Sequence, residues 1–170
     1  MIATVLVVCG VCGAGKSTLG AALASHLSVP FKDGDDLHPS VNIDKMSAGV
    51  PLDDSDRFSW LDSCGRWLSN AVQCGVGGVL ACSALKRRYR DVLRAAAPTV
   101  FFLFLSATDA GARTLLAERL AARAGTHFMP ASLLESQLAA CESPGDDEEA
   151  TVVVDVRLSV EAAIAVFLNL

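Results

Sequence analysis

A glycine-rich segment near the start of the chain constrains the fold more than any other feature. Residues 10–17 read Gly-Val-Cys-Gly-Ala-Gly-Lys-Ser and match G-x-x-x-x-G-K-[ST], the P-loop pattern that cradles phosphate groups. A β-branched apolar run at 4–9 precedes the segment, and Leu19, Leu23 and Leu27 follow it at helical spacing. Strand, loop and helix in this order are the context that the pattern requires, so we predict nucleoside triphosphate binding here.

The residue types of the P-loop indicate what each position contributes. Successive backbone N–H groups converge on phosphate, and the N-terminus of the following helix adds the positive end of its dipole. Lys16 supplies a mobile cation for the outer phosphates, and the hydroxyl of Ser17 is suited to binding Mg²⁺. The predicted nucleotide-binding residues of this segment are Gly10, Val11, Cys12, Gly13, Ala14, Gly15, Lys16, Ser17 and Thr18.

The rest of the chain alternates strand and helix patterns. Apolar runs predict strands at 77–82, 99–106 and 151–155, and a further strand ends near Phe31. Helical patterns lie at 16–27, 54–74, 86–97, 109–124, 132–141 and 159–168. This alternation predicts a single α/β domain over residues 1–170, with a mostly parallel five-stranded sheet between helices on both faces.

Composition and charge exclude several classes of function. The formal net charge is −5, and the only basic run lies around Lys86 to Arg90, so a nucleic-acid partner is not expected. No apolar run approaches the length of a membrane span, and a secretion signal is lacking at the N-terminus, so we expect a cytoplasmic protein. In that reducing compartment the six cysteines are expected to be free thiols, and Cys12 a small packing residue rather than a redox sensor. Segment 143–149, which carries four consecutive acids, is predicted to be a solvated loop.

A second polar segment follows the strand that ends near Phe31. Loops at the carboxyl ends of parallel strands bind ligands, and Asp33 and Asp35 lie in such a loop. Phosphoryl transfer requires a carboxylate that orients the attacking hydroxyl and a metal that spreads charge on the phosphate oxygens. Asp33 and Asp35 are suitably placed for both tasks, so we predict Lys16, Asp33 and Asp35 as the catalytic set.

Three stretches of sequence resemble motifs of the P-loop gluconokinases. The first runs from Asp33-Gly34-Asp35 through Leu37-His38-Pro39, Asn42, Lys45-Met46, Gly49, Pro51-Leu52 and Asp56-Arg57 to Trp60-Leu61. The second comprises Cys82-Ser83-Ala84-Leu85-Lys86 and Tyr89-Arg90-Asp91, and the third Arg119, Arg123 and His127-Phe128. With the P-loop, these motifs cover most of the chain in the order of the family.

The resemblance implies an activity, a fold and an assembly. It implies that ATP, with Mg²⁺, phosphorylates D-gluconate to 6-phosphogluconate. It implies a three-layer fold like that of nucleoside monophosphate kinases, with a mobile lid around 119–131, and a homodimer as the family's frequent state.

The same resemblance assigns roles to the two aspartates and extends the list of site residues. It implies Asp35 as the carboxylate facing the acceptor hydroxyl, and Asp33 as a residue near the Mg²⁺ ion with Ser17. The carboxylate of the substrate needs a cation, and guanidinium groups can bind it with two hydrogen bonds. The predicted substrate-binding residues are Asp35, His38, Arg57, Lys86, Arg90 and His127. Arg119 and Arg123, four residues apart on one helical face, are predicted to clamp the ATP phosphates when the lid closes. The spacing around Thr126 is one residue longer than the family pattern.

Two other functions remain open from the sequence. One is a P-loop kinase for another small acid, such as shikimate, or for a nucleoside monophosphate; the His-Pro and Asp-Arg stretch argues against it. The other is a nucleotide-binding switch without turnover. The paired aspartates of the acceptor loop disfavour a switch, because such a loop has a role only when an acceptor is bound.

Overall fold

The chain folds into strands and helices that alternate along almost its whole length. The computed structural model describes residues 4–122 and 133–169. Its elements in chain order are β1 (Val5–Gly10), α1 (Lys16–Leu27), β2 (Phe31–Asp33), the 3-10 turn η1 (Gly34–Leu37), α2 (Ser40–Ser47), α3 (Asp54–Gln73), β3 (Gly78–Ala81), α4 (Arg87–Ala96), β4 (Phe101–Ser106), α5 (Ala110–Ala122), α6 (Leu133–Ala140), β5 (Thr151–Asp155) and α7 (Val160–Leu168).

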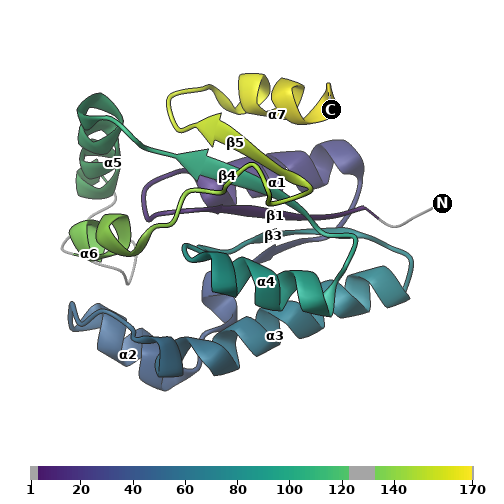
Figure 1. Cartoon of the computed structure of the whole chain (residues 1–170), viewed down its shortest axis with the longest axis horizontal. Coiled ribbons are helices and arrows are strands. Elements are labelled where there is room, and N and C mark those ends of the chain that lie inside the picture. Colours follow the sequence, from purple (N-terminus) through teal and green to yellow (C-terminus); the bar gives the residue numbers. More distant parts are fainter. Residues whose placement is uncertain (1–3, 123–132, 170) are drawn as a thin grey trace.

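The five strands among the described residues belong to one parallel sheet in the order β2-β3-β1-β4-β5, which confirms the predicted fold class. β1 is the central strand, where Val7 pairs with Leu80 of β3 and with Phe102 of β4. Helices α1 and α7 cover one face of the sheet and helices α3 and α4 the other (Figure 1). The P-loop, η1 and the turn after β3 therefore meet at the carboxyl edge of the sheet.

The alternation of side chains along β1 builds a core on each face of the sheet. Leu6 and Val8 pack in the cluster that includes the buried leucines of α1. Val5, Val7 and Cys9 point the other way and pack against Trp60 and its neighbours in α3. Successive side chains of a strand point to opposite faces, so a strand covered on both sides is apolar throughout, as the run at 4–9 is.

Helix α2 was not among the predicted elements. It spans eight residues and buries Asn42 and Met46, which are four positions apart, while Val41 is 67% exposed. The buried face thus contains an amide and the exposed face an apolar residue. A helix with this pattern lacks the apolar periodicity on which a sequence-based assignment depends.

The prediction of a solvated loop at 143–149 is wrong for one of its acids. Glu148 is buried, and its two carboxylate oxygens accept hydrogen bonds from Arg90 Nε and Nη2 at 2.7 and 2.6 Å. Arg94 donates a further hydrogen bond to Glu148 at 3.0 Å. A buried carboxylate is tolerated when it is paired and hydrogen-bonded, and two guanidinium groups fulfil that condition here.

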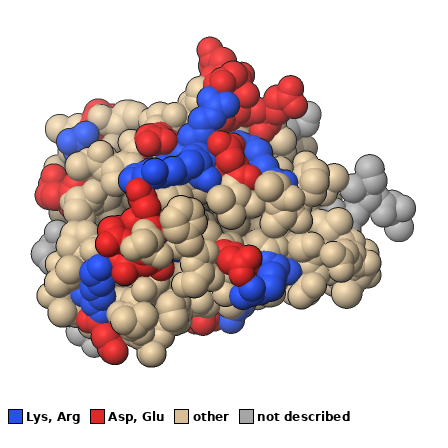
Figure 2. Space-filling model, turned by 60° about the horizontal axis from the view of Figure 1, so that its bottom comes forward, with Lys and Arg blue, Asp and Glu red and all other residues tan. Residues whose placement is uncertain are grey.

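The charged surface contains acids and bases side by side. In the face toward α3 and α4, Lys and Arg side chains border Asp and Glu side chains and form no large basic patch (Figure 2). Arg87 with Asp147 and Arg88 with Asp54 are two of the pairs. None of the helices among residues 4–122 and 133–169 has the length and apolar character to cross a membrane.

Candidate active site

The P-loop between β1 and α1 depends on glycine at two close contacts. Gly10 has φ of 140°, and a Cβ there would lie 2.7 Å from the carbonyl oxygen of Leu105 in β4. Gly13 has φ of 78°, and a Cβ there would lie 3.0 Å from the carbonyl oxygen of Leu116 in α5. Both backbone conformations favour glycine, so the pattern of the sequence is enforced by neighbouring chain segments.

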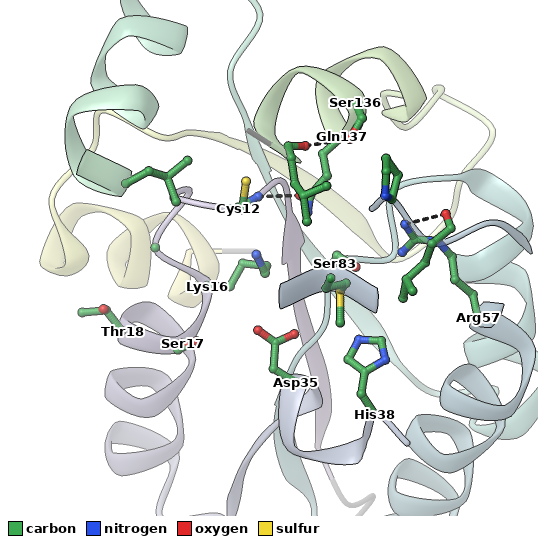
Figure 3. A pocket seen from close by; sticks show the side chains of 17 residues that line it. Cys12, Lys16, Ser17, Thr18, Asp35, His38, Arg57, Ser83, Ser136 and Gln137 are labelled. Atoms are coloured by element: carbon green, nitrogen blue, oxygen red, sulfur yellow. Dashed lines mark hydrogen bonds between the residues drawn. The ribbon is translucent and has the colours of Figure 1, made fainter. Parts of the chain in front are cut away.

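The cation of the P-loop lies at the N-terminus of α1. Lys16 is the first residue of the helix, and its Nζ donates to the carbonyl oxygen of Val11 at 3.0 Å. Its side chain thus folds back over the loop (Figure 3). The unpaired backbone N–H groups of the first helical turn and this ammonium group together favour an anion.

The two aspartates of the acceptor loop occupy different positions relative to the cradle. Asp33 accepts from the Ser17 hydroxyl at 2.5 Å with Oδ2, and from the backbone N–H of Asp35 at 3.0 Å with Oδ1. The second bond caps η1, and the turn that follows carries Asp35 into the cavity opposite Lys16 (Figure 3). The cavity is lined by Asp35 and Ser17 but not by Asp33, whose carboxylate is joined to the cavity wall through the Ser17 hydroxyl.

Most of the predicted residues near the cradle share this one cavity. Asp35 comes from η1, His38 from the residue after it and Arg57 from the first turn of α3. The guanidinium group of Arg57 also donates to the carbonyl oxygen of Leu52 at 3.3 Å, which fixes its side chain along the wall. The full lining is Cys12, Gly13, Gly15, Lys16, Ser17, Thr18, Asp35, His38, Met46, Pro51, Leu52, Arg57, Ser83, Leu120, Leu133, Ser136 and Gln137.

Several lining residues were assigned no role from the sequence. Ser83 follows β3, and its carbonyl oxygen accepts from the N–H of Gly10 at 3.1 Å. Ser136 and Gln137 come from α6, and the side-chain oxygen of Gln137 accepts from the backbone N–H of Cys12 at 2.7 Å (Figure 3). A contact between residues 125 positions apart has no local signature, so only the fold could show it.

A second hollow lies on the other side of the P-loop. It measures about 370 Å³ and is lined by P-loop backbone, by Arg119 of α5 and by the segment from Asp155 to Val160. Arg119 donates to the carbonyl oxygen of Val156 at 3.0 Å and lies 3.5 Å from the carbonyl oxygens of Gly13 and Ala14. A hollow of this size, next to a phosphate cradle and largely apolar, is suited to a nucleoside.

Comparison with known proteins identifies the family. The family model described as shikimate kinase matches residues 12–168. The gluconokinase of Gluconobacter oxydans (strain 621H) is 52% identical over 143 residues, which cover 84% of this chain and 78% of that protein. The thermosensitive gluconokinase of Escherichia coli (strain K12) is 47% identical over 87% of this chain and 76% of that protein. The chain belongs to the gluconokinase family.

Solved structures agree with membership of the gluconokinase family. An unliganded sugar kinase from Janibacter sp. HTCC2649 superposes with a TM-score of 0.89 at 41% identity, covering 98% of this chain and 93% of that one. A gluconokinase from Sinorhizobium meliloti 1021 superposes with a TM-score of 0.82 at 44% identity, covering 96% of this chain and 89% of that one.

The second gluconokinase motif, between Cys82 and Asp91, places Lys86 beside the cavity rather than in it. Lys86 Nζ donates to Asp54 Oδ1 at 3.0 Å, and the Tyr89 hydroxyl donates to the same carboxylate. These hydrogen bonds lower the pKa of Asp54 to about 2. Lys86, Asp54 and Tyr89 line an adjoining hollow, which Arg57 separates from the main cavity.

Arg90 of the same motif does not lie in the cavity, contrary to the expectation that it binds substrate. Its side chain is 0% exposed and forms the ion pair with Glu148. Its Nη1 donates to the carbonyl oxygens of Ala84, Leu85 and Glu142 at 3.1 to 3.2 Å. Arg90 therefore joins the turn after β3 to the segment at 142–148, and its fully buried guanidinium group is not among the residues that line the cavity.

The third gluconokinase motif is described only in part. Arg119 lies on α5, whereas Arg123, His127 and most of the predicted lid at 119–131 lie outside the described residues. Their predicted roles as phosphate clamp and substrate ligand therefore stay predictions.

Proposed function

We propose that this protein transfers the γ-phosphoryl group of ATP to D-gluconate, giving 6-phospho-D-gluconate and ADP. The observation that carries the proposal is the sharing of one cavity by the P-loop, the carboxylate of Asp35 and the guanidinium group of Arg57. A phosphate cradle, an acceptor-facing carboxylate and a cation for an acidic substrate are the groups that this reaction needs. Membership of the gluconokinase family supports the choice of acceptor.

The chain's own groups account for the steps of the transfer. The backbone of the P-loop and Lys16 hold the phosphates, so that the γ-phosphorus is directed at Asp35. Asp35 accepts a hydrogen bond from the gluconate hydroxyl and orients its oxygen for in-line attack. As the new oxygen–phosphorus bond forms, the bond to the bridging oxygen of ADP breaks, and the hydroxyl proton passes to Asp35 late in the step. An alcohol is a far weaker acid than a carboxyl group, so orientation is the main contribution of Asp35.

Ser17 and Asp33 fit a Mg²⁺ ion. Their hydroxyl and carboxylate oxygens lie 2.5 Å apart, and oxygen ligands are those that Mg²⁺ prefers. No group of three or more acidic, His or Cys side chains suited to a metal exists within the described residues. This agrees with an ion held by one or two protein oxygens and by the nucleotide phosphates. When bound, the ion neutralises charge that develops on the phosphate oxygens.

Arg57 and Lys86 are the proposed cations for the gluconate carboxylate. Arg57 lines both the main cavity and the adjoining hollow, so it can reach an acid that extends from one into the other. Lys86 is paired with Asp54 at 3.0 Å, so the substrate carboxylate would have to share or replace that partner. Arg119 is proposed to contact the nucleotide, because it borders both the P-loop backbone and the second hollow.

ADP release with parallel acceptors tests the proposal. The purified protein with ATP and Mg²⁺ should release ADP in the presence of gluconate, and far more slowly with shikimate or a nucleoside monophosphate. Turnover of shikimate without turnover of gluconate would overturn the assignment in favour of a shikimate kinase. Nucleotide binding without turnover of any acceptor would favour the switch.

Two further properties belong to the proposal. We expect a cytoplasmic enzyme, and the six free cysteines are compatible with a reducing compartment. We expect a homodimer from the family resemblance, and light scattering after size-exclusion chromatography measures its mass.

A further inference from the structure

His38 is held in a fixed plane at the wall of the cavity. Its ring stacks on the indole of Trp60 with centroids 4.3 Å apart and planes inclined by 10°. Trp60 is itself fully buried, and its Nε1–H donates to the carbonyl oxygen of Gly34 at 2.7 Å. The imidazole is thus packed from below by a side chain that cannot move without breaking a buried hydrogen bond.

Asn42 determines which ring nitrogen of His38 carries the proton. Asn42 is 2% exposed, and its Nδ2 donates to the carbonyl oxygen of Asp56 at 2.8 Å. A carbonyl oxygen only accepts, so this bond fixes the orientation of the amide. The second hydrogen of the same Nδ2 faces His38 Nδ1 at 3.4 Å. His38 Nδ1 must therefore accept, and the proton of a neutral ring is on Nε2.

The charge of the ring follows from its surroundings. Burial, followed by the positive charge of Arg57, lowers the pKa of His38 to about 4. At neutral pH the ring is therefore uncharged and has one N–H group. Figure 3 shows the ring directed into the cavity beside Asp35, on the side of the cavity where the acceptor would lie.

We propose that Asn42 holds His38 as a neutral Nε2–H donor that recognises a hydroxyl oxygen of the acceptor. In this assignment His38 is a specificity-determining residue and Asn42 is a positioning residue that acts through it. The inference rests on the proposed function for the identity of the acceptor. A polyol next to its reacting hydroxyl offers further hydroxyl oxygens, and a fixed donor three residues from Asp35 selects for them. An acceptor without an oxygen at that place would leave the N–H group unpaired in a buried site.

Two substitutions of His38 test whether its hydrogen-bond donor or its packing on Trp60 is needed to bind the acceptor. His38→Gln keeps an N–H group near the position of Nε2 but loses the aromatic stack, whereas His38→Phe keeps the stack and loses the donor. We expect His38→Phe to raise KM for gluconate about tenfold, since a buried partner loses its hydrogen bond, with KM for ATP unchanged. His38→Gln should retain most of the wild-type KM. His26→Phe and His26→Gln, on the exposed surface of α1, are matched controls.

Nitrogen-15 NMR of the histidine rings tests the tautomer without any substrate. His38 in the wild-type protein should show a protonated Nε2 and an unprotonated Nδ1 at pH 7, and Asn42→Leu should weaken this preference. Asn42→Leu should also raise KM for gluconate, with less effect than His38→Phe. Thermal melting identifies a variant that fails to fold, in which case the wild-type spectrum still decides the tautomer.

The outcomes distinguish this inference from the proposed function. A protonated Nδ1 in the wild-type protein would overturn the inference, and so would a His38→Phe variant with normal KM beside an impaired His38→Gln variant. Absence of gluconate turnover in the wild-type protein would overturn the proposed function, while the NMR experiment would still test the tautomer of His38 independently.

Discussion

The phosphate-binding side of the cavity and its acceptor side are built in different ways. The cradle is one continuous segment, residues 10–17, whose main-chain groups and single lysine are proposed to bind the phosphates. The acceptor side consists of isolated side chains from η1, α3, the turn after β3, and α6. The first is therefore fixed by local sequence, while the second depends on how distant elements pack.

Distant contacts support the acceptor side in particular. Asp54 at the start of α3 binds Lys86 and Tyr89, which lie more than thirty residues later. Arg90 binds both the turn after β3 and Glu148. We infer that a substitution far from the cavity can impair the acceptor side and spare nucleotide binding. Three experiments examine the difference between the two sides, and Glu148→Gln tests this inference directly.

The largest effect is expected from Asp35→Asn. The substitution keeps the shape of the side chain but removes the charge that orients the acceptor hydroxyl and receives its proton. We expect kcat to fall by about 10²- to 10⁴-fold, the range for a positioned acid–base group, with ATP affinity close to that of the wild type. Steady-state ADP release and calorimetric titration with ATP measure the two quantities.

Two control variants serve for comparison with Asp35→Asn. Asp36→Asn alters an exposed neighbour that pairs with Lys32, and should change neither quantity. Lys16→Ala removes the cation of the cradle and should impair both turnover and ATP affinity. Wild-type turnover by Asp35→Asn would remove this residue from its proposed role.

The two sides also differ in how far they were predictable from sequence. The helix at 16–27 and the strand at 151–155 were predicted with their observed bounds, because P-loop and apolar patterns are local. The cavity likewise contains the predicted Asp35, His38 and Arg57. Each of these residues lies near the carboxyl edge of a parallel sheet, whose position follows from the alternation of strands and helices.

The wrong predictions concern charged residues whose burial depends on a partner far along the chain. Arg90 was assigned to substrate and Glu148 to solvent, yet they pair with each other, 58 positions apart. Runs of charged residues are usually solvated, so neither residue carries a sign of burial in its own neighbourhood. Helix α2 was missed for a related reason, since the burial of Asn42 depends on His38 and on the backbone of Asp56.

An effect of intermediate size is expected from Glu148→Gln. The hydrogen bonds from Arg90 lower the pKa of Glu148 to about 2 in the folded protein. A depressed carboxyl pKa stabilises the fold above the unfolded value near 4.5, and the contribution is lost as the pH falls from there towards 2. Glu148→Gln should lower the free energy of unfolding at pH 7 by about 3 kcal/mol and weaken its dependence on pH in that window.

Chemical denaturation at several pH values measures this effect. Asp147→Asn is the control, because its ion pair with Arg87 is largely exposed and such pairs contribute about 0–1 kcal/mol. Glu148→Gln should also raise KM for gluconate, since Arg90 orders the turn that carries Ser83, and leave ATP affinity unchanged. A loss of ATP affinity as large as the rise in KM for gluconate would contradict the inference that the acceptor side can be impaired while nucleotide binding is spared.

The smallest effect is expected from Gln137→Leu, which removes a contact joining the two sides. Gln137 comes from the α6 wall of the cavity, and its side-chain oxygen accepts from the backbone N–H of Cys12 in the cradle. Without that oxygen a buried N–H group loses its partner, at a cost of about 1–3 kcal/mol, and the cradle is ordered less well. We expect the KM values for ATP and for gluconate to rise together by similar factors, because one contact serves both sides. Gln137→Glu keeps an oxygen at this position and should preserve the hydrogen bond, although its charge would oppose the phosphates. A rise in KM for gluconate alone in Gln137→Leu would show that α6 belongs to the acceptor side only. The cradle would then keep its structure without the contact from Gln137.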